Sequence, residues 1–149
     1  MKFLSKVFAT FFGAGYFPLA PGTFASLITA LLYKFFLADW QWELFACSWL
    51  VVFFVGLFSS TRYSRELRQK DPGQIVIDEV SGQMIALFLV PSSWLPVLLS
   101  FFLFRLFDVV KPYPIRRLER LEDGLGIMAD DVLAGLYAGI LVHLYLILK

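Results

Sequence analysis

The chain is poor in cysteine, histidine and charge. Its 149 residues include one cysteine and one histidine, which excludes an intrachain disulfide framework and a cysteine-rich metal site. Charged residues make up 17% of the chain, against about 25% in an ordinary soluble domain. The formal net charge is only +1. A charge this small creates no field that would recruit nucleic acid, so no nucleic-acid partner is expected.

Hydrophobic residues take the place of the missing charges. They make up 59% of the sequence, with 17 Phe and 4 Trp. This composition excludes an extended disordered chain, which would lack aromatic and branched aliphatic residues. It also exceeds what the core of one small domain can bury, so lipid is expected to cover the remainder. We therefore predict a small membrane protein that forms a single domain over residues 1–149.

Two runs are long enough to cross a bilayer. Residues 44–60 carry no charge, and as a helix they would extend about 26 Å, close to a hydrocarbon core of roughly 30 Å. Residues 132–148 form a second run, interrupted only by His143. The weaker hydrophobic segments are residues 23–37, 80–90 and 93–107, and residues 1–17 are typical of an interfacial or re-entrant helix. The predicted fold is an all-α, polytopic membrane bundle of four to five hydrophobic helices, with interfacial or re-entrant helices added.

The basic residues predict how this bundle is oriented. Nine of the 13 Lys and Arg residues lie in two connections, residues 62–70 and 105–120. The positive-inside rule places both connections in the cytoplasm. With that orientation, residues 13–26, 71–82 and 105–131 all emerge at the cytoplasmic face. The chemistry-bearing residues lie almost entirely in these three segments.

Acidic residues stand at the ends of three apolar helices in these segments. They are Asp78, Glu79, Asp108, Asp130 and Asp131. Carboxylates at a lipid boundary are costly unless they are paired or bind a cation. Helix capping is an alternative explanation for Asp78 and Glu79, and an ion pair with Arg105 is one for Asp108. If the five acids converge, either some of them hold protons or divalent cations compensate their charge. Oxygen ligands alone would favour Mg²⁺ over Zn²⁺.

Positive groups accompany the acids. Arg105, Asp108 and Lys111 share one helix face before Pro112 ends that helix. Pro21, Gly22 and Thr23 are typical of a helix start with Thr23 as the N-cap, whose exposed N–H groups could bind phosphate. Residues 115–122 are expected to form a short basic surface helix, and residues 123–126 a flexible turn. A magnesium site beside phosphate-binding cations indicates phosphoryl chemistry on a lipid headgroup.

Four ordered motifs in this chain resemble the phosphatidylglycerophosphatase A family. They are PGTFAS at 21–26, DPGQIVIDEVSGQ at 71–83, FRLFDVVKPYPIRRLE at 104–119 and GLGIMADDVLAG at 124–135. The resemblance implies hydrolysis of the terminal phosphomonoester of phosphatidylglycerophosphate, which yields phosphatidylglycerol and phosphate. It also implies Mg²⁺ dependence and a place in the bacterial inner membrane. The distribution of basic residues, rather than the resemblance, predicts an active site at the cytoplasmic face. One departure is visible, since residues 123–126 read Asp-Gly-Leu-Gly where the family often has a Gly-Gly pair.

The resemblance also implies roles for individual residues. The five acids named above would be the metal ligands and, with Lys111, the catalytic residues. Lys111 would bind the phosphate, with Arg105 assisting and Thr23 as a further substrate contact. The nucleophile would be a water activated by Mg²⁺, or one of the aspartates.

Other functions stay open on the sequence alone. Intramembrane carboxylates also line ion and proton pathways, so a small transporter is one alternative. Another is a phosphatase for a different lipid phosphomonoester, such as phosphatidate. The sequence predicts neither the number of metal ions nor the oligomeric state.

Overall fold

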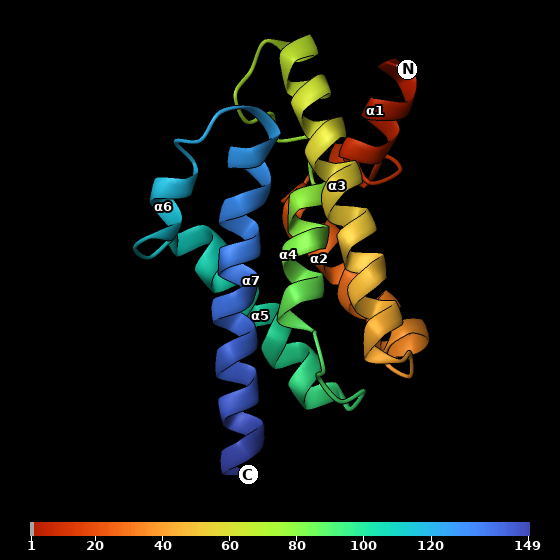
Figure 1. Ribbon diagram of the computed structural model, residues 1–149, viewed down its shortest axis with the longest axis vertical. Coiled ribbons are helices and arrows are strands. Elements are labelled where there is room, and N and C mark those ends of the chain that lie inside the picture. Colours follow the sequence, from red (N-terminus) through yellow and green to blue (C-terminus); the bar gives the residue numbers. More distant parts are fainter. Residues whose placement is uncertain (1) are drawn as a thin grey trace.

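The computed structural model describes residues 2–149, and the described chain is all-α, without a strand. The predicted fold class is confirmed at this level. Figure 1 shows helices α1 (Lys2–Ala9), α2 (Pro21–Leu32), α3 (Trp42–Leu67), α4 (Ile77–Ala86), α5 (Trp94–Val110), α6 (Ile115–Leu118) and α7 (Asp123–Leu148). A 3-10 turn, η1 (Ala14–Tyr16), precedes α2, and a π-helical segment, η2 (Tyr33–Leu37), continues it.

Two helices are long and apolar enough to cross a membrane. They are α3 and α7, each of 26 residues, or about 39 Å at the rise of an α-helix. Helix α2 with η2 forms a shorter apolar helix, while α4 and α5 have 10 and 17 residues. Length and composition thus identify two spans, fewer than the four to five hydrophobic helices predicted.

The two long helices extend beyond the predicted apolar runs. Helix α3 continues to Leu67 and so includes Arg62 and Arg65. Helix α7 begins at Asp123, so the flexible turn predicted for residues 123–126 is wrong. Gly124 belongs to the first helical turn, where a Cβ would overlap the carbonyl oxygen of Leu57 on α3. This glycine therefore permits close helix packing. The basic helix predicted for residues 115–122 is shortened to the four residues of α6.

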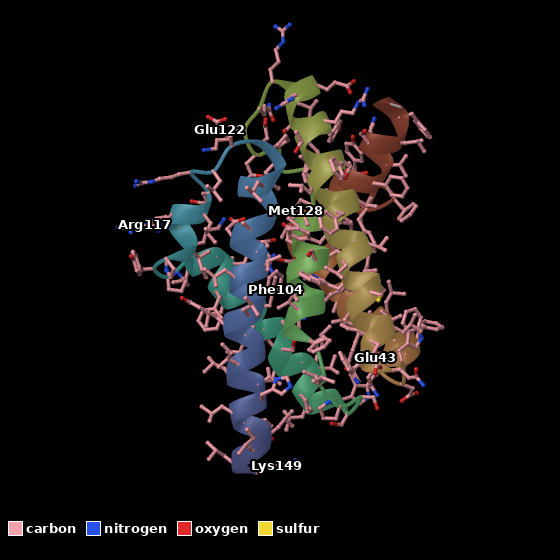
Figure 2. The ribbon with its side chains drawn as sticks, viewed as in Figure 1. Glu43, Phe104, Arg117, Glu122, Met128 and Lys149 are labelled. Atoms are coloured by element: carbon pink, nitrogen blue, oxygen red, sulfur yellow. The ribbon has the colours of Figure 1, made fainter. Side chains whose placement is uncertain are left out.

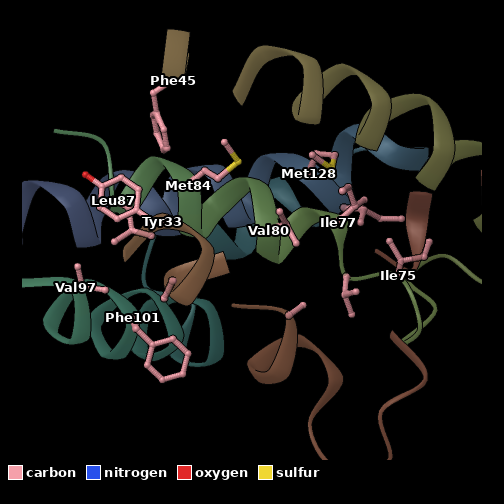
Figure 3. Packing of buried hydrophobic residues seen from close by; sticks show 14 of the residues in the cluster. Tyr33, Phe45, Ile75, Ile77, Val80, Met84, Leu87, Val97, Phe101 and Met128 are labelled. Carbon is pink, nitrogen blue, oxygen red and sulfur yellow. The ribbon is translucent and has the colours of Figure 1, made fainter. Parts of the chain in front are cut away.

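Helix α4 lies at the centre of the bundle. It packs against α2, α3, α5 and α7 (Figure 1). Eight of its 10 residues are buried, and Val80, Met84 and Leu87 contribute to the apolar core seen in Figure 3. Phe101 of α5 and Met128 of α7 belong to the same cluster. A short helix enclosed in this way can carry polar residues without exposing them to lipid.

The outer surface is apolar over much of the bundle. Exposed fractions reach 72% for Phe58 on α3, 63% for Phe102 on α5 and 80% for Ile147 on α7. Large apolar side chains exposed on several helices would promote aggregation in water. They are stable when lipid covers them. This surface supports the predicted membrane environment.

Helices α4 and α7 make backbone contact through glycine. A Cβ at Gly135 of α7 would overlap the carbonyl oxygen of Gly82 on α4. Small residues permit such close approach of membrane helices and increase their van der Waals contact. One turn further, a Cβ at Gly139 would stand 3.4 Å from the carbonyl oxygen of Ile85, an ordinary contact. The two positions therefore form a natural comparison.

We predict that Gly135→Ala destabilises the protein by about 1–3 kcal/mol relative to Gly139→Ala, because only the first methyl group forces α4 away from α7. Both substitutions raise the helix propensity by a similar amount, so this contribution cancels when the two variants are compared. Thermal unfolding of the detergent-solubilised variants, followed by circular dichroism, measures the difference. Equal unfolding midpoints for the two variants would contradict the close contact.

Candidate active site

The fold brings all five predicted acids to one region of the bundle. Helix α4 supplies two of them in its first turn, α5 one and α7 two, and α4 packs against both of those helices. Four of the acids are buried, with exposed fractions between 3% and 9%, and Glu79 is half-buried as a residue. Their surroundings divide the acids into two groups.

The first group is an acidic cluster formed by Asp78, Glu79 and Asp131. One carboxylate oxygen of each lies within 4.8 Å of the others. Each residue also has a buried carboxylate oxygen without a hydrogen-bond partner: Asp78 Oδ1, Glu79 Oε2 and Asp131 Oδ2. Within residues 2–149, no Lys or Arg forms an ion pair with any of the three. Burial of unpaired carboxylates is costly, and this cluster could hold a metal ion.

Asp108 belongs to the second group, whose members have cationic partners. Its Oδ2 lies 2.7 Å from Nη1 of Arg105, one helical turn earlier on α5. This is the ion pair considered as an alternative on the sequence alone. The Arg105 side chain is only 17% exposed, and its charge also attracts the carboxylate of Glu79. Arg105 therefore pairs with Asp108 and also contributes positive charge near the acidic cluster.

Asp130 is paired with Lys111 at the end of α5. The ammonium of Lys111 donates to Asp130 Oδ2 at 2.6 Å and to Glu119 Oε1 at 2.7 Å. Burial alone would lower the pKa of Lys111, but these two hydrogen bonds raise it above its ordinary value. The side chain therefore stays cationic at physiological pH. Sequence reasoning missed Glu119, because a loop and α6 separate it from Lys111 and no helical spacing links them.

The first turn of α2 packs against the acidic cluster. Helix α2 begins at Pro21 with Ala20 as its N-cap, so the prediction of Thr23 as the N-cap is wrong. Proline at the first helical position supplies a suitable backbone angle without needing a donor. Thr23 is the third helical residue and is half-buried. A Cβ at Gly22 would overlap Oε1 of Glu79, so the positive end of this helix meets that carboxylate.

A cavity of about 390 Å³ opens beside the Lys111–Asp130 pair. Glu119 and Asp130 form part of its wall, together with residues of α6 and of the segment before α4. We call this cavity the basic pocket, because three basic side chains line it: Lys70, Arg116 and Arg120. The sequence shows that these residues are basic, but not that they share one cavity.

Comparison with known proteins identifies the family of the chain. The family model described as phosphatidylglycerophosphatase A matches residues 7–146. The chain belongs to this family. The match includes every candidate residue described above. No solved structure matches the chain.

Three curated relatives span most of the chain. A protein of Haemophilus influenzae named phosphatidylglycerophosphatase A is 41% identical over 88% of this chain and 82% of its own length. One of Escherichia coli with the same name is 35% identical, over 87% of this chain and 77% of its own. A third, of Bacteroides thetaiotaomicron, is named "Putative phosphatidylinositol-3-phosphatase" and is 37% identical over 95% and 92% of the two chains.

We predict that Gly22→Ala greatly reduces activity while the protein stays folded. The added methyl group would displace the Glu79 carboxylate, an end of a flexible side chain, and would leave the helix backbone in place. Activity in a phosphatase assay should fall at least about tenfold, since a displacement of 1 Å in an active site can cost about 100-fold. The thermal unfolding midpoint should change little. Full activity in the alanine variant would show that the position of Glu79 is unimportant.

Proposed function

We propose that this protein is a Mg²⁺-dependent membrane phosphatase that hydrolyses the terminal phosphomonoester of phosphatidylglycerophosphate. The products are phosphatidylglycerol and inorganic phosphate. The observation that carries the proposal is the acidic cluster, with three buried carboxylates that have no cationic partner in the described chain. Two cations, Arg105 and Lys111, lie beside it. Membership of the phosphatidylglycerophosphatase A family and the names of two curated relatives support this substrate.

The donor set of the acidic cluster fits Mg²⁺. All its ligands are carboxylate oxygens, the type that Mg²⁺ prefers. Oxygens on opposite sides of a bound Mg²⁺ lie about 4 Å apart, and those of Asp78, Glu79 and Asp131 lie within 4.8 Å. The oxygens without hydrogen-bond partners are available as ligands. When bound, the ion would neutralise charge on the phosphoryl oxygens and make water more acidic.

The chain's own residues can perform the remaining steps. Arg105 and Lys111 would bind phosphoryl oxygens and stabilise the charge that develops on them. Asp130 Oδ2 is held by Lys111, while its Oδ1 is buried without a partner. That free oxygen would accept a proton from the attacking water. The water oxygen forms a bond to phosphorus as the bond from phosphorus to the glycerol oxygen breaks. The proton that Asp130 accepted then passes through solvent to the glycerol oxygen.

A position at the cytoplasmic face of a bacterial inner membrane suits this chemistry. The C-terminal end of α3 and the N-terminal end of α7 lie together at one end of the bundle (Figure 1), and Figure 2 places Arg117 and Glu122 toward this end. Positive charge in these connections favours the cytoplasm. Two acyl chains would stay in the bilayer while the headgroup reaches the acids. The curated relatives are bacterial proteins.

The Bacteroides relative suggests a second candidate substrate. Its name denotes a phosphatase for a phosphatidylinositol phosphate, which is also a lipid with a phosphodiester and a terminal phosphomonoester. The family match favours an enzyme over the ion or proton transporter considered on the sequence alone.

Phosphate release by the purified protein tests the activity. We expect release from phosphatidylglycerophosphate with Mg²⁺, no release after treatment with EDTA, and recovery when Mg²⁺ is added back. Phosphatidate and phosphatidylinositol 3-phosphate serve as the comparison lipids. Release that persists in EDTA would overturn the metal dependence, and exclusive hydrolysis of phosphatidate would overturn the substrate.

Substitution of the acids tests the site. We predict that Asp78→Asn, Glu79→Gln and Asp131→Asn each lower kcat at least about 100-fold, because each removes a charged ligand. Mg²⁺ should raise the thermal unfolding midpoint of the unaltered protein but not of these variants. Glu43→Gln is the matched control, since Glu43 is exposed and lies near the opposite end of the bundle (Figure 2). Equal effects in the control and the site variants would place the metal elsewhere.

A further inference from the structure

The basic residues of the cytoplasmic connections differ in their partners. Arg65 forms an ion pair with Asp123, and Arg117 donates to the hydroxyl of Tyr113 at 3.0 Å while its guanidinium stacks over the same ring. Lys70, Arg116 and Arg120 form no ion pair within residues 2–149. These three are also the basic residues that line the basic pocket. Three cations without an ion pair are therefore gathered at one cavity, whereas Arg62 and Arg68, which also form none within the described chain, do not line it.

Two cations from outside the lining compensate part of the negative charge of the four acids in this pocket. Lys111 pairs with Glu119 and Asp130, and Arg65 pairs with Asp123. Asp71 is the remaining acid of the lining, and Lys111 attracts its carboxylate electrostatically. With Lys111 and Arg65 counted, five cations stand against four carboxylates, and the cavity and its ion-pair partners carry a formal net charge of +1. Such a cavity favours an anion over a neutral group.

The basic pocket adjoins the proposed reaction site. Asp130 lines the pocket and is bonded to Lys111, and the next residue of the chain, Asp131, belongs to the acidic cluster. A headgroup that places one phosphate near the acidic cluster would extend its other polar groups into this cavity. The volume of about 390 Å³ gives room for more than one phosphate group. Arginine suits such a contact, because its guanidinium binds phosphate oxygens with two parallel hydrogen bonds.

We propose that the basic pocket binds the phosphodiester of the substrate headgroup through Arg116 and Arg120, with Lys70 contributing charge. The inference rests on the proposed function, because it places the terminal phosphate at the acidic cluster. It makes the pocket the element that selects lipids with two phosphates. Phosphatidylglycerophosphate and phosphatidylinositol phosphates carry both groups, whereas phosphatidate has no phosphodiester. Phosphatidylglycerol keeps the phosphodiester after hydrolysis, so the product should compete for the pocket.

The double variant Arg116→Gln/Arg120→Gln tests this assignment. In mixed micelles we expect its apparent KM for phosphatidylglycerophosphate and its inhibition constant for added phosphatidylglycerol to rise about tenfold each, the loss typical of charge-assisted hydrogen bonds. The kcat should stay within about twofold, because neither arginine touches the reacting phosphate. Arg116→Lys/Arg120→Lys should recover part of the lost affinity, since it restores charge without the paired hydrogen bonds.

The matched control is Arg62→Gln/Arg117→Gln. It removes the same charge from the same end of the bundle, but neither residue lines the pocket. It should leave the KM and the inhibition constant nearly unchanged. An equal rise in both double variants would overturn the proposal in favour of general attraction to an anionic surface. Unchanged constants in the pocket variant would also overturn it.

The unaltered protein separates this inference from the proposed function. If it fails to hydrolyse phosphatidylglycerophosphate, the proposed function fails and the inference fails with it. If it is active and the pocket variant has the same KM and inhibition constant, only the inference fails. A fall in kcat at unchanged KM would place the two arginines at the reacting phosphate and would contradict a phosphodiester site.

Discussion

Mutual repulsion among buried carboxylates is the constraint on which this structure depends. Five acids meet inside a bundle whose exterior is suited to lipid, and within residues 2–149 only Asp108 and Asp130 have cationic partners. The three of the acidic cluster lie within 4.8 Å of one another and have no such partner in this range. Charges so placed are stable only when a cation or protons compensate them. Three features would compensate this negative charge: the proposed magnesium site, the positive end of α2 beside Glu79, and the guanidinium of Arg105.

The arrangement of the helices makes this concentration of charge possible. Helix α4 is too short to span a bilayer, but α2, α3, α5 and α7 enclose it. The surrounding helices present their apolar side chains outward, as Phe58 and Ile147 do. The polar residues of α4 are thereby protected from lipid along the helix, while its first turn carries Asp78 and Glu79. An enclosed short helix thus places charged residues inside a bundle whose exterior is apolar.

The sequence predicted the helical class and the two longest helices, because an absence of charge over 17 residues is a strong signal. It did not predict their ends. Arg65 and Asp123 extend the helices beyond the apolar runs, and they form an ion pair with each other across α3 and α7. The sequence indicated the five acids as candidate site residues because they stand at the ends of apolar helices. Their division into paired and unpaired groups was not, because it depends on contacts such as that of Lys111 with Glu119. Likewise, the many arginines are equivalent in the sequence, and only packing places two of them at one cavity.

The glycine contact between α4 and α7 has a consequence for the ion selectivity of the proposed magnesium site. It fixes the helix that carries Asp78 and Glu79 against the helix that carries Asp131, backbone to backbone. A coordination cage whose walls cannot separate discriminates among cations by their radius. Calcium requires oxygen distances of about 2.3–2.6 Å and more ligands than magnesium, which binds at about 2.0–2.1 Å. A pair of residues without side chains would thus exclude the larger ion, although neither residue coordinates any cation.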